Sequence, residues 1–160
     1  MFYSLLIRTR RRHGLPPQPI TWFRNLLRFL EESIEIRVAL KDQRPIASIV
    51  TLKHPHSMIY KYGCSDERYH AAGAMPFLLW RLIEATKSNS IPILDFGRSD
   101  LDNPGLIRFK DQWGTRQTDL KYYRFPAPER TETGGGRLKR SAEAVFESSA
   151  AWFTGTLDSR

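Results

Sequence analysis

Hydrophobic residues recur with helical spacing in the first part of the chain. Residues 2–13 place Phe2, Leu5 and Leu6 on one face, and a glycine and two prolines end the pattern by position 17. Residues 20–33 repeat the pattern, with apolar side chains at Trp22, Phe23, Leu26, Leu27, Leu30 and Ile34. Because such spacing gives a helix one apolar face, we expect two amphipathic helices here.

The pattern then changes from helical to alternating. Apolar residues alternate with other residues, or β-branched residues dominate, in three runs that cover residues 36–40, 46–52 and 58–62. Residues 41–44 and 54–56 separate the runs and have the composition of turns. This arrangement predicts a three-stranded antiparallel meander.

A third helix and a buried strand follow. Residues 74–88 carry an apolar stripe, with Pro76 in the first turn, and residues 91–96 form a short apolar run. A strand–helix–strand passage of this length normally makes a parallel crossover. Asp95, Phe96 and Gly97 then lie at the carboxyl end of a parallel strand, where ligands bind in open α/β sheets.

One more helix and strand complete the pattern. Asn103 can cap a helix with Pro104 at its first position, and Gly114 can end it. A last strand is expected over residues 118–125. The predicted fold is therefore α/β with a mixed sheet, in the order helix, helix, three antiparallel strands, helix, strand, helix, strand.

The chain beyond this pattern divides into two parts. Residues 126–136 end in three glycines and read as a linker. Residues 137–160 predict an amphipathic helix with basic residues at its start. We favour packing of its apolar stripe on protein over docking at a membrane surface.

Composition and charge restrict the kinds of partner that the protein can bind and the cellular compartment in which we expect it. No apolar run approaches the roughly 20 residues that span a bilayer, and arginines at positions 8 and 10–12 follow the first apolar stretch rather than precede it. We therefore expect a cytoplasmic protein. The single cysteine, Cys64, excludes an internal disulfide. The net charge of +8 fits either a polyanionic partner, such as tRNA or a phosphorylated substrate, or a merely soluble basic surface.

Four short motifs occur along the chain in an order that is typical of a known family. They are Tyr60–Ser65, Met75–Trp80, Leu94–Ser99 and Gly105–Gly114, the last reading Gly-Leu-x-x-Phe-Lys-x-x-Trp-Gly. In this order they resemble the FemAB-like branch of the GNAT acyltransferase superfamily, over about residues 1–125. The resemblance implies a GNAT-like fold without its first strand, similar to the second of two tandem domains. It also implies transfer of an acyl or aminoacyl group to an amine, with acyl-CoA or aminoacyl-tRNA as donor.

The same resemblance suggests acceptors and partners. Relatives modify muropeptide precursors or lie near exopolysaccharide genes. An N-terminal GNAT-like domain would be the expected partner, and the open sheet edge would also allow a homo-oligomer. Met1 could then be an internal methionine of a longer protein. The loop before the third helix, residues 70–75, keeps only the central glycine, Gly73, of the usual pyrophosphate-binding pattern.

The resemblance and the residue types single out a candidate site. Asp95 could act as a base or orient a group, or it could cap the next loop. Lys110 is a second catalytic candidate, expected to project toward the same strand end, or it could be a solvated or ion-paired lysine. Arg98 and Lys110 could also bind phosphate there. Arg108 and Trp113, in the same motif as Lys110, are further substrate-binding candidates.

Other residues are weaker candidates for a functional site. Tyr60 and Tyr62 are expected on one face of a strand that lines the acyl groove, where a hydroxyl could protonate a leaving group or the rings could simply pack. His54 and His56 lack companions for a metal site, so no metal is expected. A rival interpretation is a catalytically degenerate GNAT-fold module that binds a protein partner or a polyanion.

Overall fold

The computed structural model describes residues 1–120 and 149–154. The chain divides into two compact units, the first holding Met1–Asp95 and the second Phe96–Gly155. In the described part of the chain, no helix combines the length and hydrophobicity needed to cross a membrane.

The first unit is built on a mixed sheet. Strands β1 (Ile34–Lys41), β2 (Arg44–His54) and β3 (Ser57–Ser65) form an antiparallel meander. Strand β4 (Ile93–Asp100) then pairs with β3 in parallel, starting from Ser57 opposite Ile93. The predicted meander and parallel crossover are both confirmed.

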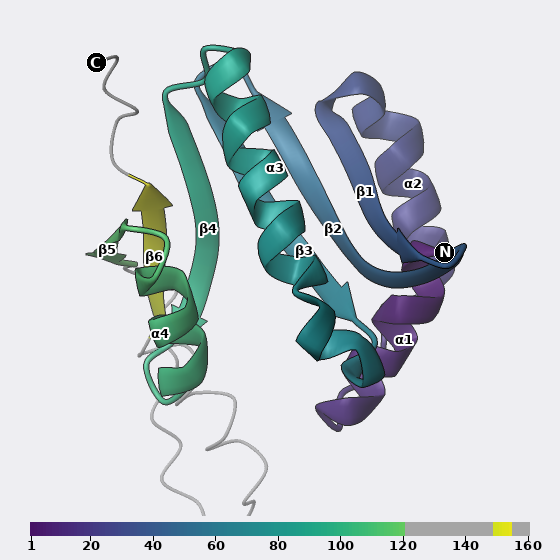
Figure 1. Cartoon of the computed structure of the whole chain (residues 1–160). Coiled ribbons are helices and arrows are strands. Elements are labelled where there is room, and N and C mark those ends of the chain that lie inside the picture. Colours follow the sequence, from purple (N-terminus) through teal and green to yellow (C-terminus); the bar gives the residue numbers. More distant parts are fainter. Residues whose placement is uncertain (121–148, 155–160) are drawn as a thin grey trace, which may run out of the picture. The chain divides into compact units, whose positions relative to one another are not determined.

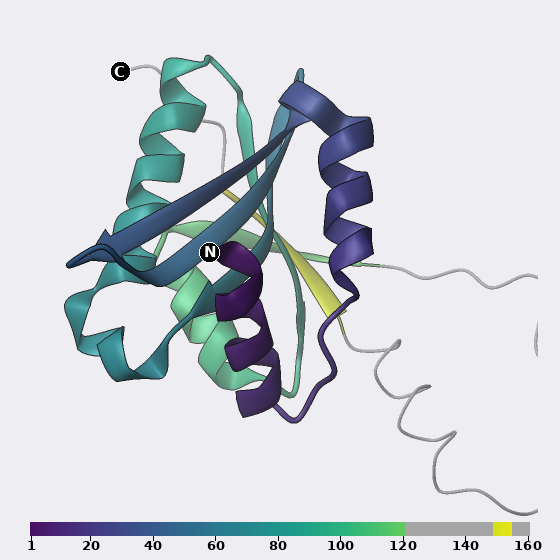
Figure 2. The ribbon, with the colours of Figure 1, turned by 90° about the vertical axis from the view of Figure 1, so that its right-hand side faces the viewer.

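Helices cover both faces of this sheet (Figures 1 and 2). Helices α1 (Phe2–Arg12) and α2 (Ile20–Leu30) lie on one face, and α3 (Ala74–Ser88) lies on the other. Two short 3₁₀ turns, Glu31–Ser33 and Glu67–Ala72, connect helices to strands. Because β2 is covered on both sides, its residues 46–51 are all buried, as expected of a central strand.

The turn between β1 and β2 fixes their register. Asp42 and Gln43 both have positive φ, at 49° and 61°, and Lys41 pairs with Arg44 across them. Positive φ at both central residues is the conformation of a type I′ turn, whose twist matches that of the strands.

The second unit contains the end of β4, helix α4 (Pro104–Asp111) and strands β5 (Thr115–Asp119) and β6 (Ser149–Thr154). The Asn103 side chain accepts a hydrogen bond of 3.1 Å from the amide of Leu106 and caps α4, as predicted. Strands β5 and β6 pair in antiparallel fashion, with Thr115 opposite Thr154.

The limits of two predicted strands differ from the structure. The strand predicted over 91–96 is β4, which starts at Ile93 because the amide of Ile91 still bonds to the Thr86 carbonyl at the end of α3, and which continues to Asp100. The strand predicted over 118–125 starts instead at Thr115, directly after Gly114 turns the chain with a φ of 68°; residues 121–125 lie outside the described residues.

The helix predicted over 137–160 is wrong where the structure describes it. Ser149–Thr154 form β6, because pairing with β5 supplies these residues with backbone partners. The rest of that helix and the linker at 126–136 lie outside the described residues.

Candidate functional site

Strand β3 leaves its parallel partner early. Its ladder with β4 joins Ser57–Ile59 to Ile93–Asp95. From Tyr60 to Ser65 the only ladder of β3, within the described residues of the first unit, is the one with β2. The β3 backbone therefore offers polar groups along this stretch that the parallel ladder does not use.

The same stretch of β3 contains a β-bulge at Lys61. Tyr60 pairs with Thr51 and Tyr62 pairs with Val50, so that Lys61 is an extra residue on β3. An extra residue reverses the alternation of side chains along a strand, and bulges are common beside active sites.

The bulge corrects the prediction that Tyr60 and Tyr62 share a face. The Tyr62 ring packs edge-on against Phe23 of α2, with ring centroids 5.3 Å apart, and its hydroxyl accepts a hydrogen bond from Trp22 Nε1. The Tyr60 hydroxyl instead points to Met75 of α3, with its oxygen 4.0 Å from the Met75 sulfur. Since α2 and α3 lie on opposite faces of the sheet, the two tyrosines do as well (Figure 2).

Tyr60 is held in a tight contact on the α3 face. A Cβ atom added at Gly63 would overlap the Tyr60 hydroxyl. Burial raises the pKa of Tyr60 above that of a free tyrosine, so the phenol keeps its proton into the alkaline range. The described geometry thus gives this face of β3 a protonated hydroxyl that can act as a proton donor.

Gly63→Ala should destabilise the protein by about 1–3 kcal/mol, because the new methyl group must displace the Tyr60 ring. Urea unfolding followed by circular dichroism would measure this. The loss should shrink in a Tyr60→Phe background, where the nearest remaining ring atom is 2.9 Å from the new Cβ. Gly105→Ala is a matched control, since its new Cβ would lie 3.8 Å from Asn103 Oδ1. Equal losses at Gly63 and Gly105 would contradict the contact.

The loop after β3 leads into an uncapped helix. Gly73 adopts a left-handed conformation with a φ of 66°, and α3 starts at the next residue. No side chain caps this end, and its first turn holds no acidic residue. The helix dipole and the first amides therefore favour an anion at this position. Gly73, the one residue of the pyrophosphate-binding pattern found in the sequence, lies at the start of α3.

Cys64 is a structural residue. Its side chain is 1% exposed, and its Sγ lies 3.6 Å from the Ser48 carbonyl oxygen. Burial raises the pKa of Cys64 to about 12, so it is a neutral thiol at physiological pH and a poor nucleophile.

Lys110 has a defined position in the second unit. Its side chain is 2% exposed, and its Nζ donates hydrogen bonds to the carbonyl oxygens of Gly97 at 2.8 Å and Arg98 at 3.0 Å. The ammonium group thus ties α4 to the end of β4. A structural role follows directly from these bonds, and the catalytic role predicted from the sequence stays a prediction.

The remaining predicted site residues are distributed over both units. Asp95 pairs with Ile59 at the end of the parallel ladder of the first unit, and it is half-buried. In the second unit, Arg98 and Arg108 have exposed side chains. Trp113 packs edge-on against Phe109, with centroids 6.5 Å apart. Their roles in binding substrate stay predictions.

No cluster of three or more potential metal ligands occurs among the described residues. His54 and His56 stack edge-to-face in the turn between β2 and β3, with centroids 6.1 Å apart.

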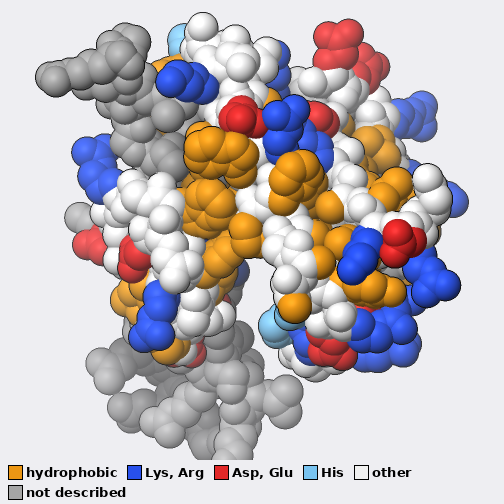
Figure 3. All heavy atoms as spheres, in the orientation of Figure 1, with side chains coloured by type: hydrophobic (Ala, Val, Ile, Leu, Met, Phe, Trp, Pro, Cys, Tyr) orange, Lys and Arg blue, Asp and Glu red, His pale blue; other side chains and the backbone are white. Residues whose placement is uncertain are grey.

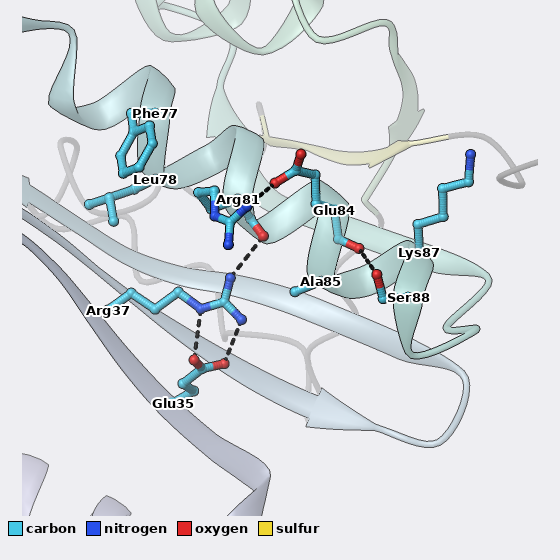
Figure 4. Close-up of a pocket in the computed structure, with 9 residues that line it drawn as sticks. All are labelled: Glu35, Arg37, Phe77, Leu78, Arg81, Glu84, Ala85, Lys87 and Ser88. Carbon is cyan, nitrogen blue, oxygen red and sulfur yellow. Dashed lines mark hydrogen bonds and ion pairs between the residues drawn. The ribbon is translucent and has the colours of Figure 1, made fainter.

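A wide hollow of about 680 Å³ lies between β1 and α3 (Figure 4). Four of its five charged groups pair with each other: Arg37 bonds to both carboxylate oxygens of Glu35, and Arg81 pairs with Glu84, while Lys87 also lines the hollow. Arg37 also donates to the Arg81 carbonyl oxygen. Hydrophobic side chains lie among these charges on the α3 face (Figure 3), and exposed Phe77 and Trp80 belong to α3. This hollow is therefore largely neutralised and a weak candidate for binding a charged substrate.

The sequence reasoning missed one charged cluster at the end of β3. Asp66 is 5% exposed and forms ion pairs with Arg68 and with Arg8 of α1. The charged run Asp66-Glu67-Arg68 was a local signal. The pairing of Asp66 with Arg8 joins residues 58 positions apart, so no short stretch of sequence indicates it.

The sequence matches the family described as acetyltransferase (GNAT) domain over residues 2–119. No curated protein gives a significant match. Among solved structures, Ard1 from Thermoplasma volcanium superposes with a TM-score of 0.69 at 16% identity, covering 98% of this chain and 91% of that chain. The ribosomal-protein-S18-alanine N-acetyltransferase from Escherichia coli gives 0.66 at 12% identity, covering 91% and 81%.

A GNAT family acetyltransferase from Elizabethkingia anophelis, solved with acetyl-CoA bound, gives a TM-score of 0.63 at 16% identity and covers 98% of this chain and 91% of that chain. At these identities the solved structures support the fold, and the family match supports membership. Because that match covers well over half of the sequence, this chain belongs to the GNAT acetyltransferase domain family.

Proposed function

We propose that this chain is an N-acyltransferase that moves an acyl group from acyl-CoA to an amine. One observation carries the proposal. Strand β3 leaves its parallel ladder after Ile59 and bulges at Lys61, and the uncapped start of α3 follows on the same connection. Family membership and the acetyl-CoA in the Elizabethkingia structure agree with this assignment.

The two features suit two parts of the donor. The backbone of residues 61–64 can hydrogen-bond an extended chain that carries amide groups, as a strand edge does. The first amides of α3, next to Gly73, can donate hydrogen bonds to the negatively charged diphosphate. The residues present therefore fit an acyl-CoA substrate, although the loop keeps only one glycine of the usual pattern.

The chemistry requires one bond to form and one to break. The nitrogen of the acceptor amine attacks the thioester carbon, the C–S bond breaks, and the amine loses a proton to solvent or a base. Backbone amides near the bulge can stabilise the developing oxyanion. The Tyr60 hydroxyl can hydrogen-bond the departing thiolate and pass it a proton, and the proton that the amine loses then restores the phenol.

The proposal is tested by incubating the chain with acetyl-CoA and a panel of amines and measuring the release of free thiol. Thiol release that depends on an amine supports it. A failure to bind acetyl-CoA in calorimetry would overturn it, as would binding without transfer to any amine of the panel.

Ala72→Asp tests the start of α3 directly. A carboxylate at this exposed position should stabilise the helix by about 0.3–1 kcal/mol. It should also weaken acetyl-CoA binding about fivefold or more, because two negative charges then compete for one site. Gln43→Asp in the β1–β2 turn changes the net charge equally and should leave binding unchanged. Equal effects of both variants would show that only net charge matters.

A finer assignment rests on the motif resemblance. The order of the motifs at 94–99 and 105–114 favours a FemAB-like enzyme that acylates an amine in a cell-wall or exopolysaccharide precursor. A precursor-derived amine that outperforms simple amines in the thiol-release assay would support this assignment, and no preference would oppose it.

A further inference from the structure

A second hollow lies at the carboxyl end of β3, in the first unit. Its volume is about 390 Å³, and six side chains line it: Arg8, Arg11, Arg12, Asp66, Glu67 and Arg68. The first three come from α1 and the others follow β3 directly. This set is called the arginine pocket below.

A buried carboxylate organises the arginine pocket. Arg68 donates from Nε to one oxygen of Asp66 at 3.0 Å and from Nη2 to the other at 2.6 Å. Arg8 donates to the second oxygen as well. These hydrogen bonds hold the pKa of Asp66 well below its usual range, so Asp66 is an anion throughout the neutral range. One carboxylate thus holds two guanidinium groups side by side.

The end of α1 is also fixed to β3. The Thr9 hydroxyl donates to the Ser65 carbonyl oxygen at 3.1 Å and accepts from the Ser65 amide at 3.0 Å. Arg12 reaches the same carbonyl oxygen at 3.4 Å. Because backbone and side chains are tied together, the pocket arginines start from a defined arrangement, which lowers the entropy cost of ligand binding.

The charge balance of the pocket is positive. Four arginines lie with two acidic residues, so two positive charges remain after pairing. The Arg8 and Arg68 side chains are 56% and 67% exposed. Each guanidinium has five N–H donors, and Asp66 uses only some of them. The hollow between β1 and α3 differs, because its two arginines pair with two glutamates.

We propose that the arginine pocket binds the diphosphate group of a small phosphorylated ligand. Paired guanidinium groups match phosphate oxygens in geometry and charge. A compact hollow suits a diphosphate better than the long basic stripe that an RNA backbone requires. The proposal does not depend on the acyltransferase assignment, because that site uses backbone groups of β3 and of the start of α3, whereas the pocket is formed by side chains of α1 and of residues 66–68.

Calorimetry with inorganic pyrophosphate and uridine diphosphate on the full chain tests the proposal. Arg11→Gln and Arg68→Gln should each weaken binding about tenfold or more, as expected for the loss of a charge-assisted hydrogen bond. Arg24→Gln, at an exposed position of α2, is the matched control and should bind like the wild type. No binding of either probe, or equal loss in all three variants, would overturn the proposal.

Asp66→Asn separates positioning from simple charge attraction. If Asp66 positions Arg8 and Arg68, its neutralisation weakens pyrophosphate binding, although it removes a negative charge. Tighter binding in this variant would contradict the positioning role. Circular dichroism would confirm that the variant is folded.

Competition identifies the source of the diphosphate. Displacement of pyrophosphate by CoA, lost in Arg11→Gln, would assign the pocket to the donor of the acyl transfer. Simultaneous binding of CoA and pyrophosphate would assign it to a different ligand, such as a nucleotide-linked acceptor. If the protein binds tRNA but shows no binding of pyrophosphate, the pocket is not a diphosphate site.

Discussion

Tyr60→Phe is expected to lower kcat for acyl transfer about a hundredfold, in the range found when a positioned proton donor is removed. The ring and its packing remain, so the KM for acyl-CoA should change little. Steady-state kinetics with acetyl-CoA and the best amine acceptor would measure both constants. Because burial raises the pKa of Tyr60, its proton is retained into the alkaline range. The wild-type kcat should therefore show no loss from Tyr60 ionisation between neutral pH and mildly alkaline pH.

Tyr62→Phe is the matched control. Tyr62 lies two positions along the same strand, but its ring packs on Phe23, on the face opposite Tyr60. Loss of its hydrogen bond from Trp22 should leave kcat within about twofold of the wild type, since that contact is exposed and a single neutral hydrogen bond is worth about 1 kcal/mol in stability. Equal kinetic losses in both variants would contradict the placement of the tyrosines on opposite faces.

Lys110→Met should destabilise the protein by about 2–4 kcal/mol. The buried ammonium group makes two charge-assisted hydrogen bonds to backbone carbonyl oxygens, and its loss leaves both acceptors without this donor. Chemical denaturation would measure the change. Arg108→Met, at an exposed position of the same helix, should stay within about 0.5 kcal/mol of the wild type.

The Lys110 experiment also decides between two roles. A variant that keeps wild-type stability but loses transfer activity would contradict the structural role and favour the catalytic role expected from the motif. A variant whose activity falls only in proportion to its folded fraction would support the structural role.

Sequence patterns predicted most helix limits well, because local chemistry sets them. The predicted limits of α3 agree with the structure at both ends, and Asn103 caps α4 as its residue type and the following proline suggested. The antiparallel meander could also be predicted from the sequence, since the alternation of apolar residues and the turn residues are local signals.

Features that depend on contacts between distant segments could not be predicted from the sequence. The alternation of Tyr60 and Tyr62 predicts one shared face, and nothing in the sequence indicates the extra residue at Lys61 that separates them. The apolar spacing around Trp152 fits a helix, but pairing with β5 makes Ser149–Thr154 a strand. The ion pair between Asp66 and Arg8 likewise depends on α1 packing against the end of β3.

Hydrogen exchange with and without acetyl-CoA tests most directly whether β3 and the start of α3 hold the donor. The ligand should slow exchange of the amides of residues 61–64 and of Ala74 and Met75, while α2 stays unchanged. Protection confined to other segments, with residues 61–64 exchanging as in the free protein, would contradict the proposed site.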